Sequence, residues 1–412
     1  MKKIIALVLS LILMSATWGQ RCLSDMMLAQ KMAESPVVQA RRAAIEANRT
    51  TGEHAVSFRN VVTLQVVVHV VYHNALENIS DLQIQSQINA LNEDFRLQNA
   101  NAGIVTLPEF ANVMADLEIE FQLADTDPWG QPTNGITRTA TTESTIGIAV
   151  APDGRRRICY TELGGQDAWC PEHYINIWVG KFPPGIAGEG SYPGEDEPEE
   201  DGIRIDPSRF GRTGLAVAPF NLGRTLTHEM GHFFDLPHIF GSVGSCEMDD
   251  GFEDTPTQKD PYLGCPFGWS YNSCNSKDMY VNYMDYTDDA CMAMFTNEQK
   301  NRVRSILEGA RAGLLMPGSC GPVDTQEHSP NWFSGRVFPN PSKGIIYLDL
   351  PFGNENEYYV DLYDLAGRLV QERYNFHAGT HAIDLGQLEN GIYFIKITKG
   401  ENSIIVKLIV IA

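Results

Sequence analysis

The residue types best suited to chemistry lie in one short run, in which His228, Glu229 and His232 form a His-Glu-x-x-His pattern. If residues 221–233 form a helix, both imidazoles lie on one face, one turn apart, and can bind the same ion. Zn²⁺ in a catalytic site usually takes three protein ligands and keeps a fourth position for water, whose pKa it lowers to about 7. Glu229, beside the histidines, would accept the proton of that water. The run therefore indicates a zinc hydrolase site.

A third ligand must come from beyond the helix, and His238 can supply it if the chain turns sharply at or near Asp235. The extended motif resembles that of the metzincins, which have Gly at the position of Asp235. Gly is favoured there because the turn needs a positive φ, and Asp and Asn are the next most tolerant residue types. We therefore expect Asp235 to serve in place of Gly.

Metzincins also carry a methionine-containing turn beneath the metal, and residues 282–286, with Met284 at their centre, resemble it. The sequence from there to Cys291 resembles the pappalysin family, most of all its bacterial members. Tyr286 matches a tyrosine that hydrogen-bonds the tetrahedral intermediate in several metzincins, and a packed tyrosine is the alternative. The resemblance implies a zinc-dependent metalloendopeptidase that is made as a latent proenzyme.

The start of the chain indicates export. Residues 1–19 have the charged start and short apolar run of a secretory signal peptide, and no segment is apolar for long enough to span a bilayer. Residues 20–59 precede the first strong strand and resemble a propeptide. By resemblance to related proenzymes, Cys22 or Asp25 could occupy the open position of the metal. The alternative for Cys22 is a disulfide with Cys320, or no role.

The chain has eight cysteines, which in an exported protein indicate disulfides. Resemblance to the family implies two pairs that tie the segment between the third histidine and the methionine turn, and we expect a further local pair. The pairs are Cys246–Cys274, Cys265–Cys291 and, locally, Cys159–Cys170.

Two acidic stretches differ in their expected roles. Asp250, Asp254 and Thr255 fall where pappalysin relatives bind calcium, and they supply the oxygen ligands that hard cations need. Residues 195–201 are expected to form a solvated loop, because repelling charges disfavour packing.

The elements before the zinc motif mix strands and helices. Residues 61–72 read as a buried strand, Ser80 can cap the helix that follows, and residues 117–123 and 174–179 are further strands. The apolar stripe of the helix consists of Ile84, Ile88, Leu91 and Phe95. This α+β pattern fits the zincin fold that the resemblance implies for residues 60–320: a twisted mixed sheet, a backing helix and active-site helix, and an irregular lower half with the Met-turn.

The C-terminal part has a different pattern of residue types. After a polar linker at 321–332, residues 333–412 contain short β-rich runs separated by turn signals, as in a small all-β sandwich. Residues 337–341, 391–393 and 407–410 resemble the C-terminal sorting domain of type IX secretion cargo. This resemblance implies a protein that is secreted or held at the cell surface through the outer-membrane secretion machinery. A carbohydrate- or protein-binding module is the alternative.

The net charge and the residue at position 290 indicate which partners and substrates to expect. The net charge of −21 argues against nucleic acid, and we expect protein or peptide substrates and a monomer. Some bacterial relatives select a basic residue after the scissile bond through an acidic side chain just before the cysteine that follows the Met-turn. Ala290 stands there, which argues against an arginine preference, although Asp288 and Asp289 are near in sequence and could substitute.

Two other functions stay open on the sequence alone. The chain could be a zinc-binding adhesin that has lost catalysis, in which case Asp235 would be a lesion. It could also be a metal-dependent hydrolase of cell-wall peptides.

Overall fold

The computed structural model describes residues 22–47, 61–241, 243–266, 268, 271–315, 336–338, 342, 344–350, 357–364, 368–388, 391–400 and 402–410. The chain divides into two compact units, residues 1–320 and 321–412. The expected signal peptide, all of the expected linker, and Cys320 lie outside the described residues. The boundaries expected from the sequence stay predictions.

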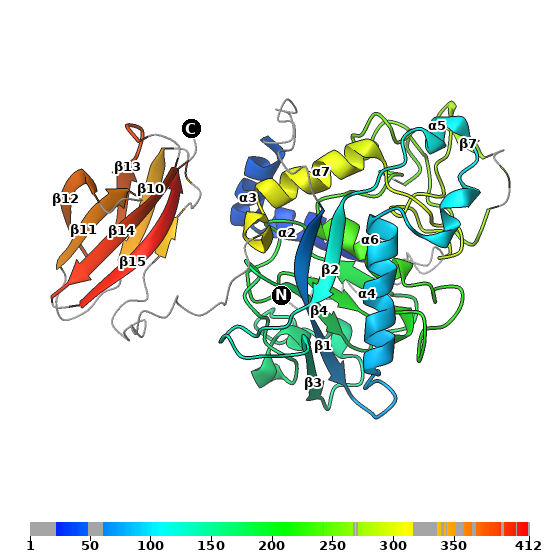
Figure 1. The fold of residues 1–412 in the computed structure, drawn as a ribbon, viewed down its shortest axis with the longest axis horizontal. Coiled ribbons are helices and arrows are strands. Elements are labelled where there is room, and N and C mark those ends of the chain that lie inside the picture. The colour runs from blue at the N-terminus through cyan, green and yellow to red at the C-terminus, as the bar shows by residue number, and fades with distance from the viewer. Residues whose placement is uncertain are drawn as a thin grey trace. The chain divides into compact units, whose positions relative to one another are not determined.

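The first unit is built on a mixed sheet with the strand order β2-β1-β4-β6-β5, and β3 also pairs with β1 (Figure 1). Its strands are β1 (Val62–Tyr72), β2 (Ile119–Leu123), β3 (Ile136–Ala140), β4 (Ile175–Val179), β5 (Gly188–Gly190) and β6 (Ile203–Ile205). The valine-rich β1 is buried along most of its length, as a central strand should be. Only β5 runs antiparallel to its neighbour, and it ends the sheet, so its outer edge can pair with another extended segment.

The helices of this unit are α2 (Ser24–Glu34), α3 (Pro36–Ala47), α4 (Asp81–Phe95), α5 (Pro108–Ala111), α6 (Arg224–Phe233) and α7 (Asn297–Glu308). The Ser80 cap of α4 is confirmed, since its side chain accepts a hydrogen bond from the Gln83 amide at 3.2 Å. The predicted stripe of α4 is buried and faces the core. Helix α6 begins later than predicted, because Gly223 has a φ of 84° and interrupts any helix before Arg224. Figure 1 shows α4 and α6 running side by side.

A buried carboxylate fixes α4, α6 and the predicted Met-turn relative to one another. Asp94, on α4, forms an ion pair with Arg224 at 3.3 Å and accepts a hydrogen bond from the Thr227 hydroxyl at 2.7 Å. The Tyr283 hydroxyl donates to the same carboxylate at 2.8 Å. Burial raises the pKa of Asp94, and the charge of Arg224 opposes that rise. Because its partners satisfy it, this buried charge can hold three elements together.

The chain between α6 and α7 is irregular and is tied by disulfides. Its regular strands among the described residues are the two-residue β7 (Asn272–Ser273) and β8 (Ser276–Lys277). The Cys246–Cys274 and Cys265–Cys291 disulfides are both present. They cross-link the part of the chain that has the least hydrogen-bonded structure of its own.

The expected Cys159–Cys170 pair is wrong. Cys159 is a free, buried thiol that packs with Ile158 and Trp178, and Cys170 is disulfide-bonded to a different cysteine. Burial raises the pKa of the Cys159 thiol to about 12, so this side chain acts as a small apolar group in the core.

The second unit has two antiparallel sheets, with the orders β13-β10-β9 and β12-β11-β14-β15, and one shared apolar core. Its strands are β9 (Arg336–Phe338), β10 (Ile345–Leu350), β11 (Glu357–Asp364), β12 (Leu369–His377), β13 (Gly379–Asp384), β14 (Gly391–Lys399) and β15 (Asn402–Val410). The all-β expectation is confirmed. In the part of the chain that the structure describes, the helices lack the length and apolar character that crossing a bilayer requires.

Candidate active site

The three histidines of the motif converge on one point. His228 and His232, from α6, and His238, from the turn that follows, have their Nε2 atoms 3.1 Å apart in every pair. All three side chains are buried. Two nitrogens bound to one tetrahedral Zn²⁺ at its usual bond length lie about 3.3 Å apart, so this spacing fits a shared ion.

The other ring nitrogens show which atoms carry the protons. Nδ1 of His228 faces the Tyr283 carbonyl at 2.7 Å, and Nδ1 of His232 faces the Leu236 carbonyl at 2.8 Å. A carbonyl can only accept, so these Nδ1 atoms are protonated and the Nε2 atoms present lone pairs. Burial lowers the pKa of His232 to about 3, which favours the neutral ring. Three facing lone pairs repel one another, and a cation removes that repulsion.

The turn at Asp235 brings His238 to the cluster. Asp235 has a φ of 71°, so the chain adopts the conformation that Gly provides in the family pattern. Its buried carboxylate forms ion pairs with Arg302 on α7 and with Arg42 on α3, the latter at 2.6 Å. Asp235 therefore forms the predicted turn, and its side chain has charged partners that Gly could not have.

The predicted Met-turn lies directly under α6. The Met284 side chain is fully buried, and a Cβ placed on Gly231 would lie 2.4 Å from its sulfur. Gly231 therefore allows the helix to rest on the methionine. Tyr286 follows, with its ring centroid 4.8 Å from that of His238. Burial raises the pKa of Tyr286 well above its ordinary value, so the hydroxyl remains a donor.

Glu229 projects from α6 toward the edge strand β5. A Cβ on Gly190 would lie 2.3 Å from the Glu229 carbonyl oxygen, so only glycine permits this approach of strand to helix. Burial raises the pKa of the Glu229 carboxyl to about 8, and hydrogen bonds from Cys22 and Ser24 oppose the rise. A divalent cation at the neighbouring histidines would also lower it.

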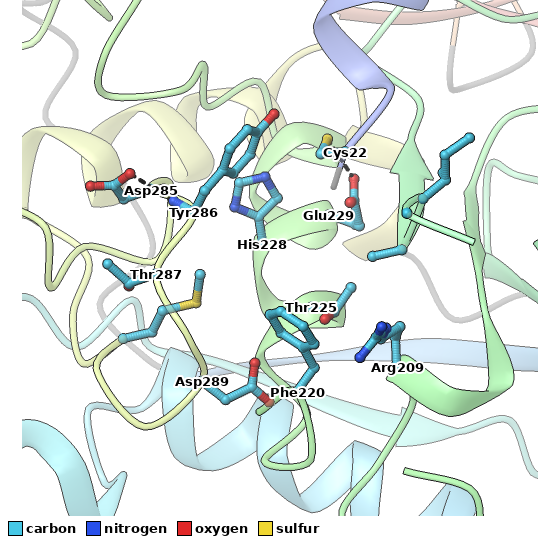
Figure 2. A pocket seen from close by; sticks show the side chains of 14 residues that line it. Cys22, Arg209, Phe220, Thr225, His228, Glu229, Asp285, Tyr286, Thr287 and Asp289 are labelled. Carbon is cyan, nitrogen blue, oxygen red and sulfur yellow. Dashed lines mark hydrogen bonds between the residues drawn. The ribbon is translucent and has the colours of Figure 1, made fainter. Parts of the chain in front are cut away.

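The N-terminal segment enters this site. The Cys22 thiol donates to Glu229 Oε2 at 3.3 Å, and its sulfur and the three imidazole nitrogens all lie within 4.8 Å of one another. Figure 2 shows Cys22 and Glu229 facing each other beside His228 and Tyr286. Asp25 lies elsewhere, since it accepts from Nδ1 of His238 at 2.5 Å and not at Nε2. Of the two expected latency residues, Cys22 is the one beside the metal position, and as a free thiol it is not paired with Cys320.

A pocket opens next to these groups. Its lining includes Ala187 beside β5, Phe220, the guanidinium of Arg209, and the carboxylate residues Asp285 and Asp289 (Figure 2). Ala290, on which the specificity argument was based, is exposed and is not part of this lining. The pocket therefore combines two buried carboxylates with the guanidinium of Arg209, and the preference for or against a basic substrate residue stays a prediction.

Two of the three residues expected to bind calcium lie close together. The Thr255 hydroxyl lies 2.7 Å from Oδ1 of Asp250, but both oxygens of Asp254 accept hydrogen bonds at the start of α7, from Thr296 and the Glu298 amide. Calcium in this segment stays a prediction.

The prediction that residues 195–201 form a solvated loop is wrong, because three of their acidic side chains are buried. Glu195, Asp196 and Glu200 are buried, because Arg156 approaches Asp196 at 2.8 Å and Glu200 at 2.9 Å. The charges do not repel one another into solvent, since arginines from elsewhere in the chain lie between them.

Comparison with known proteins decides the family. Residues 162–308 match the family model described as pregnancy-associated plasma protein-A, and residues 336–411 match the secretion system C-terminal sorting domain. An extracellular metalloprotease of Arthroderma benhamiae is 31% identical over 261 residues, which are 61% of this chain and 80% of that protein.

Two solved structures from Tannerella forsythia are also similar. A promirolysin variant is 39% identical, with a TM-score of 0.66, over 72% of this chain and 97% of the other. Mature mirolysin in complex with a cleaved peptide is 42% identical, with a TM-score of 0.60, over 63% of this chain and 97% of the other.

The chain belongs to the pappalysin family. It is a metalloendopeptidase with a metzincin fold and a type IX sorting domain, and it is secreted or held at the cell surface. The family membership implies zinc. As a pappalysin, the chain is an enzyme, and nothing in the described residues supports the adhesin alternative.

Sequence reasoning missed several residues that shape the site. Gly190 and Ser24 carried no signal beyond their types, and Arg209 was not considered. Their roles depend on contacts between distant segments, which spacing alone does not reveal.

The Asp235 carboxylate should stabilise the fold even though Gly suits its φ. Asp235→Gly leaves Arg302, which is 4% exposed, without its principal partner, so we expect the free energy of unfolding to fall by about 3 kcal/mol. The double variant Asp235→Gly/Arg302→Met should recover most of that loss. Urea unfolding of the three proteins measures both effects, and a glycine variant as stable as the parent would contradict the role of the carboxylate.

Proposed function

We propose that this pappalysin hydrolyses peptide bonds in proteins with zinc held by His228, His232 and His238. The observation that supports this most is the convergence of three Nε2 lone pairs within 3.1 Å, with the opposite nitrogens of the two α6 histidines fixed by backbone carbonyls. Zn²⁺ bound there would polarise the scissile carbonyl and acidify a water molecule.

Glu229 is the proposed general base. Its carboxylate faces the position of the Cys22 sulfur, where water would stand once the N-terminal segment has left. Glu229 would take the proton of the attacking water and then give it to the departing amine. The Tyr286 hydroxyl would donate to the oxygen on which negative charge develops, and a purely packed tyrosine remains the alternative.

The edge of β5 is the proposed binding site for the substrate main chain. The N-terminal segment already uses this edge, since the Leu23 amide donates to the Gly188 carbonyl at 3.2 Å and the Gly190 amide donates to the Ser24 hydroxyl at 2.9 Å. An extended substrate would form main-chain hydrogen bonds to the same strand. The neighbouring pocket, in which Asp285 and Asp289 lie together with Arg209, would take the residue after the scissile bond.

Glu229→Gln should lower kcat by about 10²–10⁴-fold, because the amide keeps the shape of the carboxylate but cannot accept the proton. Bound zinc should remain near one per chain, since Glu229 is not among the proposed ligands. Cleavage of a quenched protein substrate and metal analysis measure the two quantities. In the parent enzyme, 1,10-phenanthroline should abolish cleavage and added Zn²⁺ should restore it, and a glutamine variant with near-parental rates would rule out this mechanism.

The enzyme is proposed to be made latent, with Cys22 as the residue that blocks the metal. Three contacts of the N-terminal segment support this: Cys22 at Glu229, Asp25 at His238, and Arg42 at Asp235. The similarity to promirolysin also covers a larger share of the chain than the similarity to mature mirolysin. Removal of the segment would expose Glu229 and the edge of β5.

Cys22→Ala should raise the activity of the unprocessed protein by about tenfold for each 1.4 kcal/mol of docking that is lost. The matched control is Cys159→Ala, which removes the other free buried cysteine of the described residues without touching the site. Initial rates on a quenched substrate, before and after limited proteolysis near residue 59, give the comparison. Unchanged latency in the Cys22 variant would assign the block to another contact.

Structural calcium near Asp250 and Thr255 is the remaining proposal. The paired side chains and the disulfides on either side support an ordered loop that hard cations could join. Adding Ca²⁺ to EDTA-treated, zinc-restored protein should raise its melting temperature, and an unmoved melting temperature would argue against the ion.

A further inference from the structure

Lys31, on α2, extends into a buried charged cluster that belongs to the rest of the first unit. Its ammonium forms an ion pair with Asp196, whose side chain has no exposed surface. Burial lowers the pKa of Lys31 to about 8, and Glu195 and Glu200 are the acidic groups that oppose this. The ammonium therefore lies in a site that desolvates it and that holds the guanidinium groups of Arg156 and Arg204 as well as carboxylates.

The cluster has an excess of negative charge that its own arginines do not balance. Its carboxylates are Glu189, Glu195, Asp196 and Glu200, and its guanidinium groups are Arg156 and Arg204. Two guanidinium groups face the carboxylates of Glu189, Asp196 and Glu200 and the carboxyl of Glu195, and Lys31 supplies the third positive charge. Without Lys31, the cluster has one cation fewer than it has carboxylates other than Glu195.

One carboxylate oxygen is left over for that cation. Glu195 is 2% exposed, and its Oε2 accepts from the Tyr192 amide at 2.9 Å. Its Oε1 is buried and has no hydrogen-bond partner among the described residues. Burial, with the charge of Glu189, raises the pKa of Glu195 to about 7, as expected for a carboxyl that lacks a close cationic partner.

The cluster continues directly from the strand that the substrate is proposed to follow. β5 ends at Gly190, where Ser24 is hydrogen-bonded, and residues 191–196 follow it. Lys31 lies seven residues beyond Ser24 in α2, about 10 Å along the helix. An extended peptide covers that distance in about three residues. The first pocket, which includes Ala187, lies toward the opposite end of β5.

We propose that the cluster around Asp196 and Glu195 is a substrate subsite for a lysine or arginine side chain, about three to six residues before the scissile bond, which Lys31 fills in the latent protein. The inference rests on the proposed function, because it assigns the first pocket to the residue after the scissile bond. A side-chain cation fits better than a metal ion. Among the described residues, the group that could hold a metal is the one with Cys22 and the three histidines, and these carboxylates are not part of it.

The test uses the full chain after proteolytic activation and a series of quenched peptides with one scissile bond. Each peptide carries lysine at a single position three to six residues before that bond, and its partner carries norleucine there. At one of these positions lysine should raise kcat/KM by about tenfold, the effect of one charge-assisted contact. Asp196→Asn should remove most of that ratio, and Glu195→Gln should reduce it.

Glu197→Gln is the matched control, since Glu197 is exposed and pairs with Arg41 outside the cluster. It should keep the parental lysine-to-norleucine ratio. Equal cleavage of lysine and norleucine peptides at every position would overturn the subsite, and so would a ratio that persists in Asp196→Asn. The lysine-to-norleucine ratios of the parental enzyme test the subsite even if a variant fails to fold. No cleavage of any peptide by folded, zinc-loaded protein would instead overturn the proposed function. Peptides that vary only after the scissile bond test the first pocket separately.

Discussion

The active site depends on how three imidazole rings are turned. His228 and His232 each give their Nδ1 proton to a backbone carbonyl, so their acceptor nitrogens have to point at the same place. One carbonyl belongs to Tyr283, within the Met-turn, and the other to Leu236, in the turn after α6. The proposed metal position is thus determined by main-chain groups on two sides of the helix, and each side is held by its own tertiary contacts.

The elements that carry these main-chain groups are held in place by contacts from several other parts of the fold. Asp94 joins α4, α6 and the Met-turn through one carboxylate. Met284 packs against Gly231 from beneath α6, and Gly190 lets the edge strand touch the helix backbone on the other side. The N-terminal segment then adds charges at both ends of the site, through Lys31 and through Arg42 on Asp235. The segment thus contacts the proposed lysine subsite and the turn that carries His238.

The sequence predicted what depends on local spacing and missed what depends on distant partners. Ser80 capped α4 as expected, and Asp235 adopted the positive φ, because both effects are decided within a few residues. The start of α6 was placed too early because Gly223 was given no weight. Cys159 and Cys170 were paired because they are close in sequence, yet one of them packs in the core.

Long-range charge was the hardest feature to foresee. Residues 195–201 look like a solvated acidic run unless Arg156 and Arg204 are known to fold onto them. The choice between Ala290 and Asp289 likewise depended on which side chain the loop turns toward the pocket. No periodicity carries that information, because the loop has no regular structure.

The two disulfides have a consequence for the lifetime of the enzyme. A secreted peptidase meets other copies of itself, and irregular loops are where proteolytic nicking usually begins. A loop must be drawn out into an extended strand before it can lie along β5. Cys246–Cys274 and Cys265–Cys291 join positions 28 and 26 residues apart across the irregular half of the domain, which restricts how far that half can be drawn out. The same cross-links therefore limit the stretch of this half that a second copy could bind in extended form.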